Sequence, residues 1–149
     1  MPETTEILSE RIEQKLALLS QLRDLGFHQA ALIRAGDMTQ LLKLLSAKQR
    51  LLAALQALER QLDPFRDDDP EARVWASAAH RQRCAEAAAA CEALLRSIVE
   101  QERESESQMM RRRDEAAARL HGAQSAAEVH HAYAAESFCA PSRLDLTQG

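Results

Sequence analysis

Apolar side chains recur every three or four residues along three long stretches of the chain, which is the spacing of an amphipathic helix. The first stretch, residues 5–35, carries this repeat from Leu8 to Ile33. Gly36 follows it and suits the left-handed position after a helix, and Asp37 is a candidate N-cap for a second helix. Because this link is so short, we expect the two helices to fold back on each other as an antiparallel hairpin.

The second stretch, residues 38–62, has the most regular pattern in the chain. Its leucines recur in alternating steps of three and four residues, which is a heptad repeat, and one lysine, Lys48, occupies a position of this seam. Lys48 either extends its amine to solvent or pairs with a carboxylate of a neighbouring helix. Further leucines widen the apolar stripe, so we expect this helix to face two neighbours: Leu42, Leu45 and Leu52.

A third helix is predicted over residues 70–121, with Asp69 as its N-cap and Pro70 at its first position. No Gly or Pro interrupts residues 71–121. The first half of this segment has a core-like stripe, whereas residues 100–113 contain only Met109 and Met110 as large apolar residues. The distal half therefore lacks a core of its own, and either protrudes or is covered by something else. The core-like stripe consists of Val74, Trp75, Cys84, Ala88, Cys91, Leu95 and Ile98.

A short fourth helix is predicted over residues 126–136. Gly122 is expected to end the third helix, and Ser125 with Glu128 three residues later forms a capping box. Residues 137–149 contain a proline and mixed polar residues, and we expect a flexible tail there. The sequence thus predicts an all-α protein: an elongated antiparallel bundle of three long helices and a short C-terminal helix in one domain, residues 1–136, followed by the tail.

Composition and charge agree with this fold class and exclude several functions. Ala, Glu, Lys, Leu and Arg make up 83 of the 149 residues, as in long helices and coiled coils. The net charge of −4 argues against a nucleic-acid partner, which requires many basic contacts to phosphates. No apolar run approaches the roughly 20 residues of a membrane span, and no signal peptide is visible, so we expect no membrane insertion and a cytoplasmic location.

Candidate chemical sites are weak. Glu128 and His131 have the spacing of one arm of a di-metal carboxylate site, but a second such pair is missing. His80 and Cys84, one helical turn apart, could contact one ion. Cys84 and Cys91 are separated by roughly 10.5 Å along a helix, too far to form a disulfide with each other, and are interpreted as core residues. With no glycine-rich phosphate loop either, we expect no enzyme activity, no metal and no cofactor.

The distal part of the third helix carries acidic residues followed by three arginines, Arg111 to Arg113. The simplest interpretation of this stretch is a solvated helix face. The alternative is a docking surface, because an isolated helical segment is rarely stable in water without a partner. In that case Met109 and Met110 would be adaptable apolar contacts for a partner helix.

Residues 29–52 resemble the FlgN-type flagellar export chaperones. The resemblance lies in a helix ending in Gly36 and Asp37, followed by a second helix whose leucines surround Lys48, and it covers residues 7–62 best. It implies a non-enzymatic cytoplasmic chaperone that binds the C-terminal helical segments of hook-filament junction proteins. Such a chaperone prevents their premature assembly and delivers them to the flagellar type III export gate.

If the resemblance holds, a client helix would lie along the distal half of the third helix. Tyr133 occupies a place similar to that of the family's C-terminal tyrosine and would contact the export gate. The chief alternative is a structural coiled-coil protein without a client, in which this helix pairs with its own copy as a homodimer or scaffold. The predicted client-binding residues are Leu95, Ile98, Val99, Glu102, Met109, Met110, Arg113 and Leu120.

Overall fold

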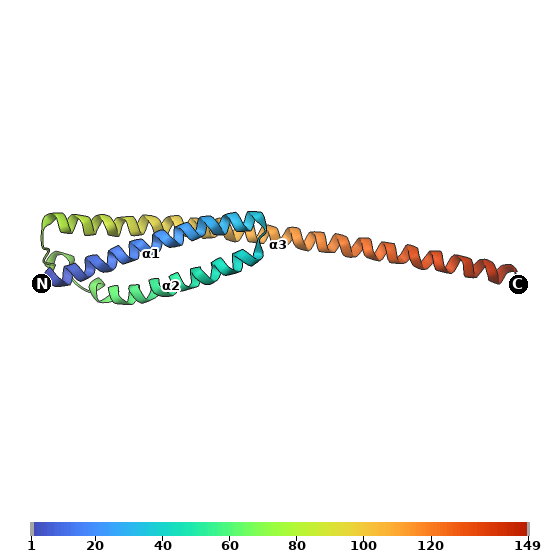
Figure 1. The fold of residues 1–149 in the computed structure, drawn as a ribbon, viewed down its shortest axis with the longest axis horizontal. Helices are drawn as coiled ribbons and strands as arrows, with labels where there is room; N and C mark the ends of the chain where they lie inside the picture. The colour runs from blue at the N-terminus through green and yellow to red at the C-terminus, as the bar shows by residue number, and fades with distance from the viewer. Residues whose placement is uncertain (1, 149) are drawn as a thin grey trace. The chain divides into compact units, whose positions relative to one another are not determined.

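The computed structural model describes the backbone of residues 2–148 and the side chains of residues 3–136. This part of the chain is mostly helical and contains no strand, which confirms the predicted all-α class (Figure 1). The chain divides into two compact units, the first ending at Gln108 and the second beginning at Met109, where the sequence predicted a single domain. The elements in order are α1 (Pro2–Ala35), α2 (Met38–Arg66), the 3₁₀ helix η1 (Pro70–Ala72) and α3 (Ala78–Gln148).

The link between α1 and α2 has the predicted chemistry. Gly36 has a φ of 72°, the left-handed conformation that a residue without Cβ adopts at least cost. The backbone N–H of Asp37 donates to the carbonyl of Leu32 (3.1 Å), so the end of α1 is closed by a Schellman-type bond. The Asp37 carboxylate then accepts from the backbone N–H of Gln40 (3.1 Å) and caps α2. Both predictions, for Gly36 and for Asp37, are confirmed.

Replacing Asp37 with Ala should lower the free energy of unfolding by about 1 kcal/mol, because the first turn of α2 loses its side-chain acceptor. Replacing Asp37 with Asn should change the free energy of unfolding by only about 0.3 kcal/mol, since an amide oxygen caps equally well. Urea denaturation followed by far-UV circular dichroism measures both. Equal losses in the two variants would show that the carboxylate acts through its charge rather than as a cap.

In the first unit, α3 runs parallel to α1 and antiparallel to α2 (Figure 1). The Cys91 thiol lies 3.7 Å from the Ile12 carbonyl, and the Gln101 amide donates to the Arg23 carbonyl (3.0 Å). Residue numbers therefore increase in the same direction along α1 and α3. α1 and α2 also pack closely and bring Cα atoms within 8 Å of each other. The first part of α3 therefore completes a group of three packed helices.

Two apolar clusters join the three helices of the first unit. In α2 the heptad seam faces inward as predicted, with Leu41, Leu58 and Leu62 buried. Of the leucines expected to widen this stripe, Leu42 and Leu45 are exposed, so the buried stripe is narrower there than predicted. The first cluster consists of Leu19, Leu22, Cys91 and Ile98, and the second of Leu8, Leu62 and Cys84 with Phe65 and Trp75 packed against it.

The end of α2 lies later than predicted. The helix continues through Pro64 to Arg66, although proline lacks the N–H that would bond the preceding turn. Phe65 packs against the second cluster, and this apolar contact offsets the lost hydrogen bond. The last helical turn therefore depends on tertiary packing and not on helix propensity.

The start of α3 also lies later than predicted. The Asp69 carboxylate accepts from the backbone N–H of Glu71 (3.0 Å) and caps a helix, as the sequence predicts. This helix, however, is only the single turn of η1. The chain is then extended until Ser77, whose hydroxyl accepts from the backbone N–H of His80 (3.0 Å) and caps α3. The extended segment is held by Thr5, which donates to the Val74 carbonyl (2.8 Å).

The predicted separate helix over residues 126–136 is part of α3 in the structure. Gly122 does not end the helix, because a single glycine costs only about 1 kcal/mol relative to alanine and strong helix formers flank it on both sides. Ser125 consequently lies inside the helix and caps nothing at a helix start. The side chains of the predicted flexible tail, residues 137–149, lie outside the described residues, so its flexibility stays a prediction.

Candidate functional site

A polar cluster joins the three helices near the far end of the first unit. The Lys48 amine on α2 pairs with the Glu102 carboxylate on α3 and donates to the Gln29 amide oxygen on α1 (3.0 Å). Only 12% of the Lys48 side chain is exposed, compared with 40% of Glu102. Of the two alternatives that the sequence left open for Lys48, the structure therefore supports pairing with a neighbouring carboxylate.

Beyond Ile98 the inward positions of α3 become polar but remain covered. Gln101 packs so closely over Gly26 that any larger residue at that position of α1 would meet its amide group. Ser105 is only 3% exposed. The first part of the distal stretch, residues 100–108, thus belongs to the first unit, and its inward face is covered by the α1–α2 hairpin. The sequence left this open, because it shows no apolar residues there.

The four predicted client-binding residues of the first unit have different environments. Leu95 and Val99 lie four residues apart on one face of α3 and are 46% and 43% exposed. Ile98 is buried in the first cluster, as its place in the core-like stripe predicts, so its side chain is covered in the free protein and its role as a client contact stays a prediction. Ile98 lies on the face of α3 that points toward the hairpin, whereas Leu95 and Val99 lie beside that face and remain exposed. Glu102 is held in the pair with Lys48 and is only partly available to a partner.

The other predicted residues lie in the second unit, which consists of one helical segment. Met109, Met110 and Leu120 are 38%, 47% and 61% exposed. Arg113 is exposed beside Asp114, with 3.5 Å between guanidinium and carboxylate. Tyr133 is 68% exposed. Met109, Arg113 and Leu120 are spaced by four and seven residues and share one face of the helix.

An open cavity of about 560 Å³ lies in the first unit and was not predicted from the sequence. It is bounded by all three helices and by the connection around η1, and we call it the α2–α3 cavity. Two of the α3 side chains that line it, Ala85 and Ala88, are small and leave this space open. Lining side chains include Leu8, Ile12, Leu62, Phe65, Trp75, Cys84, Ala85, Ala88 and Leu95.

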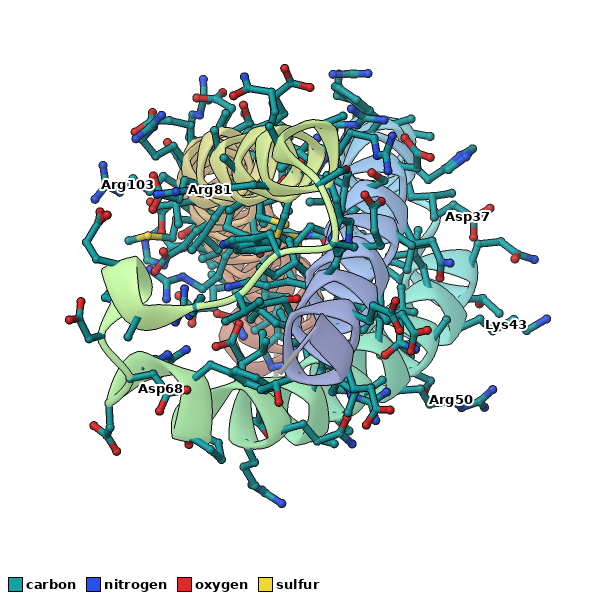
Figure 2. The ribbon with its side chains drawn as sticks, turned by 90° about the vertical axis from the view of Figure 1, so that its left-hand side faces the viewer. Asp37, Lys43, Arg50, Asp68, Arg81 and Arg103 are labelled. Atoms are coloured by element: carbon teal, nitrogen blue, oxygen red, sulfur yellow. The ribbon has the colours of Figure 1, made fainter. Side chains whose placement is uncertain are left out.

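Three arginines line the α2–α3 cavity at the end nearest the connection. Arg66 pairs with Glu59 and with Asp63 (2.9 Å). Arg81 is 3.8 Å from Glu71, and both side chains are largely exposed, so this pair contributes little. Figure 2 shows Arg81 projecting from the start of α3 on the side where the connection runs.

Arg73 differs from the other two arginines because no carboxylate pairs with it among the described residues. Its Nη2 donates to the Phe65 carbonyl (2.6 Å), and its Nε is buried without a partner. The residue is half-buried. Arg73 and Trp75 were assigned to a helix by the sequence prediction. Ser77, a good N-cap, was the signal that would have placed them in an extended connection.

Cys84 and Cys91, the two cysteines whose side chains the structure describes, have no features of a reactive site. Burial raises the pKa of both the Cys84 and the Cys91 thiols, and for Cys84 a hydrogen bond from Ser9 and the charge of Arg73 oppose this only in part. A protonated, buried thiol is a poor nucleophile. Both residues pack in the apolar clusters, which confirms their interpretation as core residues.

The candidate metal pairs lie apart from any third ligand. Among the described side chains, no three His, Cys, Asp or Glu groups are arranged to hold an ion. His80 stacks edge-on against Trp75, with 5.4 Å between ring centroids. Glu128 and His131 are exposed.

No described helix is both long enough and apolar enough to cross a membrane. Comparisons with protein-family models, with curated proteins and with solved structures found no match to this chain.

Proposed function

We propose that this protein is a cytoplasmic export chaperone that captures an amphipathic client helix along α3. The observation that carries the proposal is the unpartnered apolar face of the second unit. Its helix exposes Met109 and Leu120 on one face, and no described residue of that unit is buried. Because an isolated helix gains little stability in water, a partner helix laid on this face would bury apolar area and stabilise both.

The family resemblance is the basis for the proposed client and for the proposed three-helix bundle that supports its binding site. In this proposal the first part of α3 forms a three-helix bundle with the hairpin, and the clients are the C-terminal helices of hook-filament junction proteins. Leu95 and Val99 would extend the client-binding surface into the first unit, and Arg113 would pair with client carboxylates. Tyr133, which is exposed, would contact the flagellar export gate after the client is bound.

The direct test is isothermal titration of the full chain with the C-terminal helical segments of the junction proteins from the same organism. Saturable binding is expected for the unaltered chain. The double replacement Met109→Gln and Leu120→Gln should weaken it about tenfold, because two apolar contacts lose their burial. Urea denaturation of this variant should be unchanged, since both side chains are already solvated in the free protein.

The matched control is Leu42→Gln. Leu42 is exposed to a similar extent, 67% against 61% for Leu120, but lies on α2. It should leave client affinity unchanged. If no client segment binds and light scattering gives twice the 16.6 kDa of one chain, the homodimeric coiled-coil alternative explains the apolar face and the chaperone proposal fails.

A further inference from the structure

The α2–α3 cavity has the size of a small-molecule site. Its volume of about 560 Å³ falls within the roughly 300–1,000 Å³ of ligand pockets. Along α3 its lining runs from Arg81 to Leu95, a distance of about 21 Å at 1.5 Å per residue. The cavity therefore has the length to hold an elongated molecule.

The two ends of the cavity differ in chemistry. Toward Leu95 the lining is formed mainly by apolar side chains from α1 and α3. Toward the connection it carries Arg73 and Arg81, and Lys15 and Arg66 lie near each other between the two ends. Lys15 is already paired with Glu59 (2.7 Å), and Arg66 shares that carboxylate. A ligand with an apolar body and a charged end would match this polarity.

Arg73 determines the sign of the charge on the ligand. A half-buried guanidinium is normally compensated by a carboxylate, because removing the cation from water is costly. In the described chain Arg73 has only the Phe65 carbonyl as an acceptor. An anionic group of a ligand would supply the missing partner, and the weak, exposed pair of Arg81 with Glu71 could open to add a second contact.

We propose that the α2–α3 cavity binds an elongated apolar molecule with one anionic group, of the class of long-chain fatty acids. The anionic group lies against Arg73, and the hydrocarbon extends past Phe65 and Trp75 toward Leu95. This site shares Leu95 with the proposed client-binding surface but does not include Met109 or Leu120, so the two proposals are tested separately.

Titration of the full chain with palmitate tests the proposal. Trp75 is the only tryptophan of the protein and lines the cavity, so its fluorescence reports occupancy directly. Saturable binding of one palmitate per chain with a change in Trp75 emission is expected. Hexadecanol and hexadecyltrimethylammonium, with the same chain but a neutral or cationic end, should bind at least tenfold more weakly.

Variants locate the site. Ala88→Phe fills the cavity and should weaken palmitate binding more than tenfold, whereas Ala89→Phe, on the exposed face of the same turn, should have no effect. Arg73→Gln should weaken palmitate about tenfold, as a charge-assisted hydrogen bond is lost, and leave hexadecanol unchanged. Should Ala88→Phe not fold, as judged by circular dichroism, Ala85→Phe fills the cavity from the next turn.

Two results would overturn the inference. Absence of saturable palmitate binding, or equal binding by Ala88→Phe and Ala89→Phe, would mean that the cavity is not the site. Equal affinity for palmitate, the alcohol and the ammonium compound would mean that Arg73 selects no charge. Because neither readout uses a junction-protein segment, failure here leaves the client titration to decide the chaperone function separately.

Discussion

Replacing Leu19 with Ala is expected to lower the free energy of unfolding of the first unit by about 3 kcal/mol. Leu19 is 0% exposed and lies in the cluster where α1 meets α3 through Cys91 and Ile98. The loss has two parts: the transfer free energy of the deleted methyl groups, and the cavity left behind when neighbours relax only partly. Partial relaxation is expected because leucines of α2 also pack against this cluster.

The matched control is Leu42→Ala, which removes the same atoms from a side chain that is 67% exposed. Its effect should stay within about 0.5 kcal/mol. Urea denaturation followed by far-UV circular dichroism gives both values. A loss below about 1 kcal/mol for Leu19→Ala, or similar losses for both variants, would show that the three helices are not joined by this cluster.

Replacing Glu102 with Ala is expected to cost about 2 kcal/mol. The change leaves the Lys48 ammonium, which is only 12% exposed, with the Gln29 amide oxygen as its one remaining partner. An uncompensated charge held away from water is the main source of the loss. Because Glu102 itself is 40% exposed, the cost should be smaller than the 3–5 kcal/mol typical of fully buried pairs.

Glu100→Ala is the matched control on the same helix. Glu100 pairs with Arg103 (3.0 Å), but both side chains are more than 70% exposed, so this change should cost no more than about 0.5 kcal/mol. In a chain that already carries Lys48→Met, Glu102→Ala should likewise cost little, since the charge it compensates is gone. An undiminished cost in that background would mean that Glu102 stabilises the unit through something other than Lys48.

Local features of the fold could be predicted from the sequence. The three- and four-residue spacing identified the helices, and Gly36 with Asp37 marked the break between the first two because backbone conformation and capping depend on adjacent residues. The heptad seam correctly identified the inward face of α2. The errors arose where tertiary contacts outweigh local preference: Phe65 extends α2 through Pro64, and the contact of Thr5 with Val74 holds the chain extended before Ser77.

Of the candidate site, the sequence identified the exposed apolar residues of the second unit but not the cavity. Met109 and Leu120 could be recognised because the residues around them in the sequence are mostly polar and provide no apolar side chains against which they could pack. The cavity was missed because its lining comes from residues between Leu8 and Leu95, on three helices and a connection. Arg73 could not be recognised as uncompensated until every neighbouring carboxylate had been placed.

The amino-acid sequence by itself determined that this chain is helical, where its first hairpin turns and which side of α2 faces inward, because these depend on neighbours within one or two helical turns. Only the tertiary structure decided that Lys48 pairs with Glu102, that Ile98 is buried while Leu95 and Val99 are exposed, and that a cavity lies between the hairpin and the start of α3. Helical periodicity defines the face of each helix but not the distance between helices, which depends on the side chains packed between them.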